Sequence, residues 1–287
     1  MLYMSYTIDP NVQFVIKKPL CDGIGNVIKS FITGYSVYNN TKIDCNKNFV
    51  FGDYSSVLED EHIFDENDNL YPNRIVEYMY TSRLLVLSSE DDEQHHIFMD
   101  ENNEVNGCGN NKYNYLYSFK CLIDYNYDPN RVCNKVKNRI LTTIDKIKFK
   151  PIIIEKVLET TKTINKKTLG ISVRTWNCFH EHNINRPYHF ETYKNQIIDV
   201  INNNSIENIV ISFDNHNVEE EYIQFLSTYN IPIQILRKKE DVNELQNSII
   251  KMLTLSNCGY FIGNRISTFS ELVFWFSKCN IKCFNIF

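Results

Sequence analysis

The chain has 287 residues, of which 43% are hydrophobic and 23% are charged, a composition typical of a globular protein rather than a disordered one. The length suits one large domain or two of ordinary size. The formal net charge is −5 and there is no long run of Lys and Arg, so we expect no nucleic-acid partner.

The sequence also disfavours secreted, membrane-spanning and zinc-binding proteins. The first ten residues contain Asp9 and lack the apolar core of a secretory signal, and no segment approaches the roughly 18 apolar residues of a membrane span. The nine cysteines form no C-x-x-C pair, and their odd number disfavours a complete disulfide framework. We therefore expect reduced thiols, a cytoplasmic location and no metal site. The abundance of Asn, Ile, Lys and Tyr indicates an AT-rich genome, such as that of some large DNA viruses, protists or bacteria.

The first half of the chain opens with a glycine-rich turn. A strand predicted over 12–16 leads into Cys21-Asp-Gly-Ile-Gly-Asn26 and a helix to about Tyr38. This order is typical of a phosphate or dinucleotide loop, and Asp44 lies at about the distance of a ribose acceptor. However, Ile28 replaces the third glycine of the dinucleotide fingerprint, which weighs against an NAD site.

The rest of the first half is less regular. The segment 45–125 is acidic and rich in Asn and Tyr, and a helix is predicted over 131–147. Pro151 then marks a plausible domain boundary. We expect an N-terminal α/β domain over 1–150 and a C-terminal domain over 151–287.

The second half alternates between predicted strands and helices. The strands are expected over 169–173, 209–213, 231–236, 260–262 and 281–287, and the helices over 189–201, 218–229 and 241–255 and from Ser267 onward. Such alternation predicts right-handed βαβ units and a parallel sheet. Ligands bind at the carboxyl ends of the strands in such sheets. Three polar clusters, at 172–182, 212–216 and 263–271, are expected at that edge.

The last of these clusters has the pattern of a phosphate site. The strand from Tyr260 is expected to run into a Gly-Asn turn, after which Ser267, Thr268 and Ser270 open an aromatic-rich helix. The first turn of a helix has unpaired N–H groups and partial positive charge, which suit an anionic oxygen. The alternative is that Ser267 only caps a core helix.

The loop after the 169–173 strand contains the main candidates for chemistry. Arg174 ends a buried strand, where its permanent charge calls for an anion, and it is placed to bind a diphosphate and stabilise it as it leaves. The alternative is an ion pair with a carboxylate at a domain interface. Glu181, His180 or His182 is a candidate base for an incoming hydroxyl, unless these residues form a solvated polar loop.

Three segments resemble the motif regions of the fucosyltransferase superfamily, which includes protein O-fucosyltransferases and α1,2- and α1,6-fucosyltransferases. They are Gly-Ile-Gly-Asn26, Ser172-Val-Arg174 and Phe261-Ile-Gly-Asn-x-x-Ser267-Thr-Phe269. The resemblance implies an α/β fold of GT-B type, in which two Rossmann-like domains with parallel sheets face a central cleft. It also implies an inverting, metal-independent enzyme that uses GDP-fucose, in which the domain over 1–150 holds the acceptor and the Rossmann-like domain over 151–287 binds the nucleotide sugar.

Several residues match these motifs. Arg174 matches the arginine of the family's His-x-Arg motif, which contacts the donor diphosphate and is required for activity. Gly25 and Asn26 match the Gly-Asn of the first loop, where the asparagine lies near the donor phosphates. The phosphate-binding turn is matched by Ser267, Thr268 and Phe269.

Other positions depart from the motifs or match them loosely. Ser172 replaces the histidine of the His-x-Arg motif at a donor-site position, and Gly23 replaces the first-loop arginine of the O-fucosyltransferases. Asn177 stands where some members have aspartate. Asp214 ends a strand where the family often places an acidic residue near the nucleoside. Glu181 is similar in position to the base proposed in α1,6-fucosyltransferases.

The sequence thus predicts an inverting glycosyltransferase that transfers fucose from GDP-fucose to a hydroxyl of a glycan or a protein, with no cofactor. Two alternatives remain: a transferase for another nucleotide sugar, of rhamnose or mannose type, or an inactive protein that retains nucleotide-sugar binding. An NAD-dependent dehydrogenase is a distant third alternative, because the glycine fingerprint of the dinucleotide site is incomplete.

Overall fold

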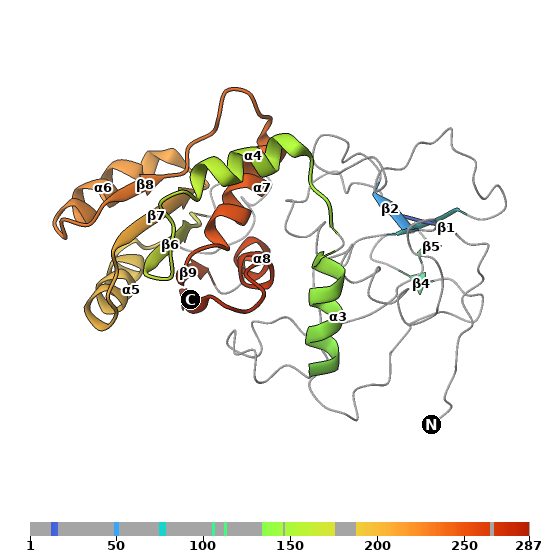
Figure 1. Ribbon diagram of the computed structural model, residues 1–287, viewed down its shortest axis with the longest axis horizontal. Helices are drawn as coiled ribbons and strands as arrows, with labels where there is room; N and C mark the ends of the chain where they lie inside the picture. The colour runs from blue at the N-terminus through green and yellow to red at the C-terminus, as the bar shows by residue number, and fades with distance from the viewer. Residues whose placement is uncertain are drawn as a thin grey trace. The chain divides into compact units, whose positions relative to one another are not determined.

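The computed structural model describes residues 13–16, 49–51, 75–78, 105–106, 112–113, 134–145, 147–175, 188–264 and 267–286 (Figure 1). The chain divides into two units, Met1–Lys150 and Pro151–Phe287. None of the helices in the described stretches is long and apolar enough to cross a membrane.

The described strands of the first unit form two small sheets. Three parallel strands lie in the order β2-β1-β3, and two further strands pair antiparallel. The elements are β1 (Gln13–Ile16), β2 (Phe49–Phe51), β3 (Ile75–Tyr78), β4 (Val105–Asn106), β5 (Lys112–Tyr113) and the helix α3 (Asn134–Asp145). The strand expected at 12–16 and the helix expected over 131–147 are therefore present. The turn with Gly25 and Asn26 lies outside the described residues.

The second unit is built on a five-stranded sheet in the order β10-β9-β6-β7-β8, with every neighbouring pair parallel. The strands are β6 (Thr168–Val173), β7 (Asn208–Phe213), β8 (Ile233–Ile235), β9 (Tyr260–Asn264) and β10 (Lys282–Ile286). Their sequences are rich in apolar, β-branched residues, as parallel strands covered on both faces must be. The predicted α/β fold with a parallel sheet is confirmed for this unit.

Within the described residues, five α-helices accompany the sheet: α4 (Pro151–Thr160), α5 (Phe190–Asn203), α6 (Glu219–Ser227), α7 (Glu244–Leu255) and α8 (Thr268–Phe276). The sequence did not predict α4, because Pro151 was interpreted only as a boundary, although proline also favours the first position of a helix. Helix α7 begins three residues later than the predicted start at Asp241. Asn243 and Gln246 form a capping box that fixes this start.

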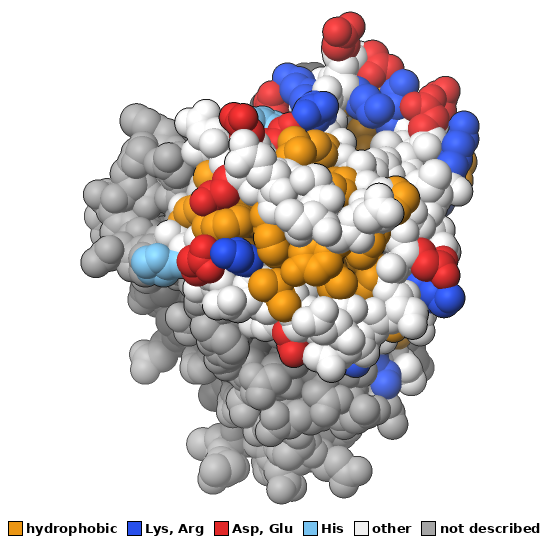
Figure 2. All heavy atoms as spheres, turned by 90° about the vertical axis from the view of Figure 1, so that its left-hand side faces the viewer, with side chains coloured by type: hydrophobic (Ala, Val, Ile, Leu, Met, Phe, Trp, Pro, Cys, Tyr) orange, Lys and Arg blue, Asp and Glu red, His pale blue; other side chains and the backbone are white. Residues whose placement is uncertain are grey.

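The main hydrophobic core lies between the sheet and helices α5 and α6. Alternate residues of the central strands point to this side, including Leu169, Ile171 and Val173 of β6, which are at most 1% exposed. They pack against Tyr193 and Ile197 of α5 and against residues of α6. Figure 2, which views the molecule from the side of α5 and α6, shows that some apolar side chains reach the surface between charged groups.

Helices α4, α7 and α8 pack together, and α7 covers the other side of the sheet. Figure 1 shows α4 beside α7, and the hydroxyls of Thr160 and Thr254 join them at 2.8 Å. A Cβ atom at Gly170 would lie 3.1 Å from both Leu255 Cδ2 and Cys258 Sγ. The missing side chain in β6 therefore lets the end of α7 lie close to the sheet.

Strand β9 is longer than predicted. The sequence favoured a turn at Gly263 and Asn264, but both residues continue the strand and pair in register with Asn285 and Ile286 of β10. A Gly-Asn pair is typical of a turn in isolation, and here pairing with a neighbouring strand overrides that local preference.

Candidate functional site

The strand order creates a topological switch point at the carboxyl edge of the sheet. From the central strand β6, the chain moves outward through β7 to β8 and then returns to the other side of β6 as β9. The connections after β6 and β9 therefore leave in opposite directions, and this switch point is where open α/β sheets bind ligands. Arg174 follows β6 and Ser267 follows β9 closely, so both predicted site residues lie at this edge.

Arg174 is held in place from two sides. Its Nη1 atom donates to Asp214 Oδ2 at 3.1 Å, and its backbone N–H donates to the hydroxyl of Tyr193 at 2.9 Å. The Arg174 side chain is 24% exposed and that of Asp214 is 11% exposed. The Arg174 guanidinium is partly exposed, and its backbone and side chain are already held by hydrogen bonds. It can therefore bind an anion with little loss of conformational freedom.

Asp214 is occupied by protein donors. Besides Arg174, its carboxylate accepts from the backbone N–H of Thr175 at 3.0 Å and from the Thr175 hydroxyl at 3.0 Å. Since Asp214 follows β7 and Thr175 follows β6, these bonds tie the two strand ends together. The resemblance implies a position near the nucleoside for Asp214, and the observed contacts show that its carboxylate also orients Arg174.

Tyr193 is a part of the site that the sequence did not single out. Its hydroxyl accepts from the Arg174 N–H and donates to the Ser172 carbonyl at 3.4 Å. Desolvation by burial raises the pKa of the phenol well above its ordinary value, so it stays a neutral hydrogen-bonding group. Its only signal in the sequence was its position on the apolar side of a predicted helix.

The first turn of α8 supplies the second half of the site. Ser267 is the N-cap residue and is 8% exposed, yet its side chain makes no capping hydrogen bond. Its carbonyl accepts the Glu271 N–H at 3.1 Å, which leaves the preceding amides of Thr268, Phe269 and Ser270 without a partner inside the helix. Ser267 thus marks the helix start, as predicted, without using its hydroxyl as a cap.

Gly263 allows α8 to start close to β9. A Cβ atom there would lie 2.6 Å from Ser270 Oγ and 2.5 Å from the ring of Phe261, both closer than atoms can approach. Glycine at this position therefore helps fix the height of the first helical turn above the sheet edge.

The remaining predicted site residues divide into two groups. Ser172 lies in β6, is 9% exposed and is paired in register with Ser212. It is one residue before the strand end, and alternation turns its side chain away from the core shared with α5 and α6. Gly25, Asn26, His180, Glu181 and His182 lie outside the described residues. In the described part of the chain, no group of three or more His, Cys, Asp and Glu is arranged to hold a metal ion.

Comparison with known proteins shows which solved structures have a similar fold. No protein-family model and no curated protein sequence matches the chain. Among solved structures, POFUT1 in complex with GDP matches with a TM-score of 0.51 and 11% identity, over 97% of this chain and 99% of that one. A second structure of POFUT1 with GDP matches with a TM-score of 0.50, 11% identity and coverage of 92% and 94%.

A plant protein gives a similar result. A substituted form of Arabidopsis thaliana FUT1 in complex with GDP matches with a TM-score of 0.52 and 10% identity, over 95% of this chain and 69% of that one. At these identities the likeness concerns the fold and leaves the activity open. The chain has a fucosyltransferase-like α/β fold.

Proposed function

We propose that the chain is a glycosyltransferase of GT-B type that takes its sugar from a nucleotide diphosphate, with GDP-fucose as the favoured donor. The observation that carries this proposal is the position of Arg174 and the first turn of α8 at one switch point, in a fold similar to structures that hold GDP. A guanidinium and a helix N-terminus are both suited to phosphate oxygens.

The proposed mechanism places the leaving diphosphate at this switch point, between Arg174 and the first turn of α8. In an inverting transfer, an acceptor hydroxyl attacks the anomeric carbon in line with the departing nucleoside diphosphate, and negative charge grows on the phosphate oxygens. Arg174 carries a positive charge that it cannot lose, and the α8 amides point donors at the same region. Groups that are already oriented stabilise such charge most effectively. Asp214 and Tyr193 supply that orientation for Arg174.

Other residues complete the proposal. We propose Ser267, Thr268 and Phe269 as the phosphate-binding turn, and Ser172, Asp214, Gly25 and Asn26 as further donor-binding residues. Glu181 is the proposed base that removes the acceptor proton, with His180 and His182 as the other candidates. The first unit, 1–150, would hold the glycan or protein acceptor, and the second, 151–287, the donor. Neither a metal nor a cofactor has a role in this scheme.

The proposal is tested by calorimetric titration with GDP, GDP-fucose, UDP and NAD in the absence of metal. We expect GDP and GDP-fucose to bind selectively and Arg174→Ala to weaken them about 10- to 100-fold, because charged hydrogen bonds are lost. Lys167→Ala is the matched control, since it removes a cation from an ion pair at the other end of β6. Preference for UDP would exclude fucose as the sugar, and a folded protein that binds no nucleotide would refute the proposal.

One departure from the family motifs favours a second candidate. Ser172 stands in place of a histidine, so the protein is a candidate for a nucleotide-sugar-binding module without turnover. Saturable GDP-fucose binding with neither transfer nor hydrolysis, across a panel of glycan and peptide acceptors, would identify that module. Release of GDP that depends on an acceptor would exclude it. Competition with GDP-rhamnose and GDP-mannose in the same assay would test the choice of sugar.

A further inference from the structure

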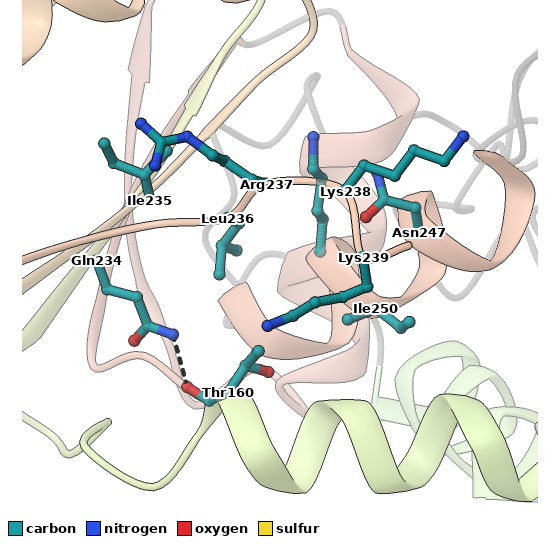
Figure 3. Close-up of a pocket in the computed structure, with 10 residues that line it drawn as sticks. Thr160, Gln234, Ile235, Leu236, Arg237, Lys238, Lys239, Asn247 and Ile250 are labelled. Atoms are coloured by element: carbon teal, nitrogen blue, oxygen red, sulfur yellow. Dashed lines mark hydrogen bonds between the residues drawn. The ribbon is translucent and has the colours of Figure 1, made fainter. Parts of the chain in front are cut away.

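Glu219, the first residue of α6, is a mostly buried carboxylate that joins two loops at the carboxyl edge of the sheet. One of its oxygens lies 2.9 Å from Nδ1 of His216, which follows β7, and the other is paired with Arg237, which follows β8. The Glu219 side chain is 13% exposed, whereas those of His216 and Arg237 are 52% and 63% exposed. Figure 3 shows that the Arg237 side chain points away from Thr160, toward which Lys239 extends. One carboxylate therefore holds side chains from two different strand ends.

The turn that contains His216 begins with Asp214. Asp214 directly follows β7, and the 3₁₀ helix η6 (His216–Val218) completes the turn before α6. The Asn215 side chain caps η6, and the Glu219 N–H donates to the His216 carbonyl. Asp214 at the start of the turn and Glu219 at its end therefore belong to one hydrogen-bonded unit, so a change in how Glu219 is held acts on Asp214.

The contacts of Glu219 differ in how they respond to pH. Desolvation by burial alone would raise the pKa of the Glu219 carboxyl, but hydrogen bonds from Arg237 and His216 outweigh this effect and lower the pKa below its ordinary value. A guanidinium keeps its charge, whereas imidazole is the side chain whose charge changes between about pH 5 and 8. Neutral imidazole can still donate a hydrogen bond, but it no longer forms an ion pair. Only the contact with His216 therefore weakens as pH rises through this range.

The other charges near His216 leave Glu219 as its main electrostatic partner. In the described part of the chain, Glu219 is the only carboxylate that forms an ion pair with His216, and Asp214 is already held by Arg174 and Thr175. The remaining charged groups of the neighbouring elements are Glu220 and Glu221 in the first turn of α6, Arg237 and Lys238 after β8, and Glu244 and Lys251 of α7.

We propose that Glu219 is a positioning residue for the donor site, and that protonation of His216 controls how firmly it holds the turn that begins with Asp214. With His216 protonated, the ion pair fixes this turn, Asp214 keeps Arg174 in place, and the donor binds more tightly. With His216 neutral, Arg237 alone pairs with Glu219, and Arg174 is less well fixed. This inference rests on the proposed function, because it concerns the regulation of nucleotide-sugar binding at that site.

The first test measures the affinity for GDP-fucose by calorimetry between about pH 5.5 and 8, without metal. GDP-fucose is the better probe, because its two phosphates are diesters, whereas the terminal phosphate of GDP changes charge near pH 6. The His216–Glu219 pair is partly exposed, so we expect the affinity of wild type to fall only about two- to fivefold as pH rises. His216→Gln keeps a hydrogen-bond donor without a charge, and its affinity should not change with pH. Equal pH dependence in the two proteins would overturn the proposal.

Two further variants test charge and location. His216→Lys stays charged throughout this range, so at pH 8 it should bind GDP-fucose more tightly than His216→Gln does, by about two- to fivefold. Lys194→Gln is the matched control, because it removes another ion pair between residues three apart, with Glu191 at 3.0 Å on α5. It should keep the pH dependence of wild type. Equal affinities of His216→Lys and His216→Gln at pH 8 would contradict a role for the charge.

The carboxylate itself is tested by Glu219→Gln. This variant keeps the shape of the side chain but removes the negative charge that His216 and Arg237 share, so it should weaken GDP-fucose binding about three- to tenfold at pH 5.5 and abolish the pH dependence. Glu220→Gln, at the exposed next position, is the control that should change neither. If Glu219→Gln does not fold, the variants of the exposed His216 still decide the question. Wild-type binding by Glu219→Gln would refute the role of Glu219.

A structural readout separates this inference from the donor-site proposal. The Thr175 N–H donates to Asp214, so its ¹H–¹⁵N resonance reports the position of that carboxylate in the absence of nucleotide. We expect this resonance to shift with the same midpoint pH as the His216 ring in wild type, and not in His216→Gln. If this coupling were present but no nucleotide bound, the donor-site proposal would fail and the control of Asp214 by His216 would stand. If GDP-fucose bound while the Thr175 resonance did not follow His216, this inference would be wrong.

Discussion

The two ends of the β6–β7 pair carry the same kind of interaction in very different settings. At the amino edge, Lys167 and Glu207 form an ion pair across the strands at 2.6 Å, with side chains 55% and 51% exposed. At the carboxyl edge, Arg174 and Asp214 form one at 3.1 Å, with side chains 24% and 11% exposed. The strands run in parallel register, so both pairs are direct cross-strand neighbours.

The difference lies in what surrounds each pair. The amino-edge pair adds only Asn165, whose amide donates to Glu207 at 3.4 Å. The carboxyl-edge pair is joined to Thr175 and, through the Arg174 backbone, to the buried Tyr193. Exposed pairs contribute little to stability, whereas a partly buried pair with further hydrogen bonds fixes the position of its charges. We therefore expect substitutions at the carboxyl edge to reduce stability and nucleotide binding, and substitutions at the amino edge to have little effect on either.

The largest effect is expected for Asp214→Ala. The change leaves Arg174 and the Thr175 N–H without their shared acceptor at a partly buried site, so we expect the free energy of unfolding to fall by about 3 kcal/mol. Urea unfolding measures it, with Glu207→Ala as the matched control at the other edge. Equal losses in the two variants would show that the two edges do not differ.

A smaller effect is expected for Tyr193→Phe. It removes the hydroxyl that accepts from the Arg174 N–H, and we expect a loss of about 1 kcal/mol in the free energy of unfolding together with weaker GDP binding. Tyr188→Phe is the control, because the Tyr188 hydroxyl contacts Tyr222 rather than Arg174. If GDP affinity stayed unchanged while stability fell, Tyr193 would have only a structural role.

The smallest effect is expected at the amino edge and depends on pH. The hydrogen bond from Lys167 is the largest of the interactions that lower the pKa of Glu207, so the folded state holds its proton less tightly than the unfolded state. Stability from this pair is present above the ordinary pKa and is lost as pH falls through the lowered value. Glu207→Gln should remove a slight rise of stability with pH near the acid end, and about 1 M salt should remove it in wild type. A difference that survives this salt would contradict the surface character of the pair.

The sequence allowed the sheet and its functional edge to be predicted because strand periodicity and helix spacing are local. Strand β6 was expected from residue 169 and begins at Thr168, and Arg174 was placed correctly at the end of that strand. Helix α4 was missed because Pro151 was interpreted as a boundary, although it is also the first residue of the helix. The extension of β9 through Asn264 was missed because it depends on pairing with β10.

The interactions within the site were harder to predict. The sequence placed Arg174 and Asp214 at one edge and considered an ion pair for Arg174, but it could not name the carboxylate, because that requires the register of β6 against β7. Tyr193 was assigned to an apolar helix side, and only the packed structure shows that its hydroxyl reaches a strand backbone.

The short edge strand β8 has a consequence for self-association. A strand at the margin of a sheet exposes unpaired backbone groups on which another chain can add a strand, and natural proteins block this with short strands and lysines. β8 has only three residues and is followed, after Leu236, by Arg237, Lys238 and Lys239, and at the opposite margin Lys282 begins β10. Both margins of this sheet are thus poor templates for edge-to-edge aggregation.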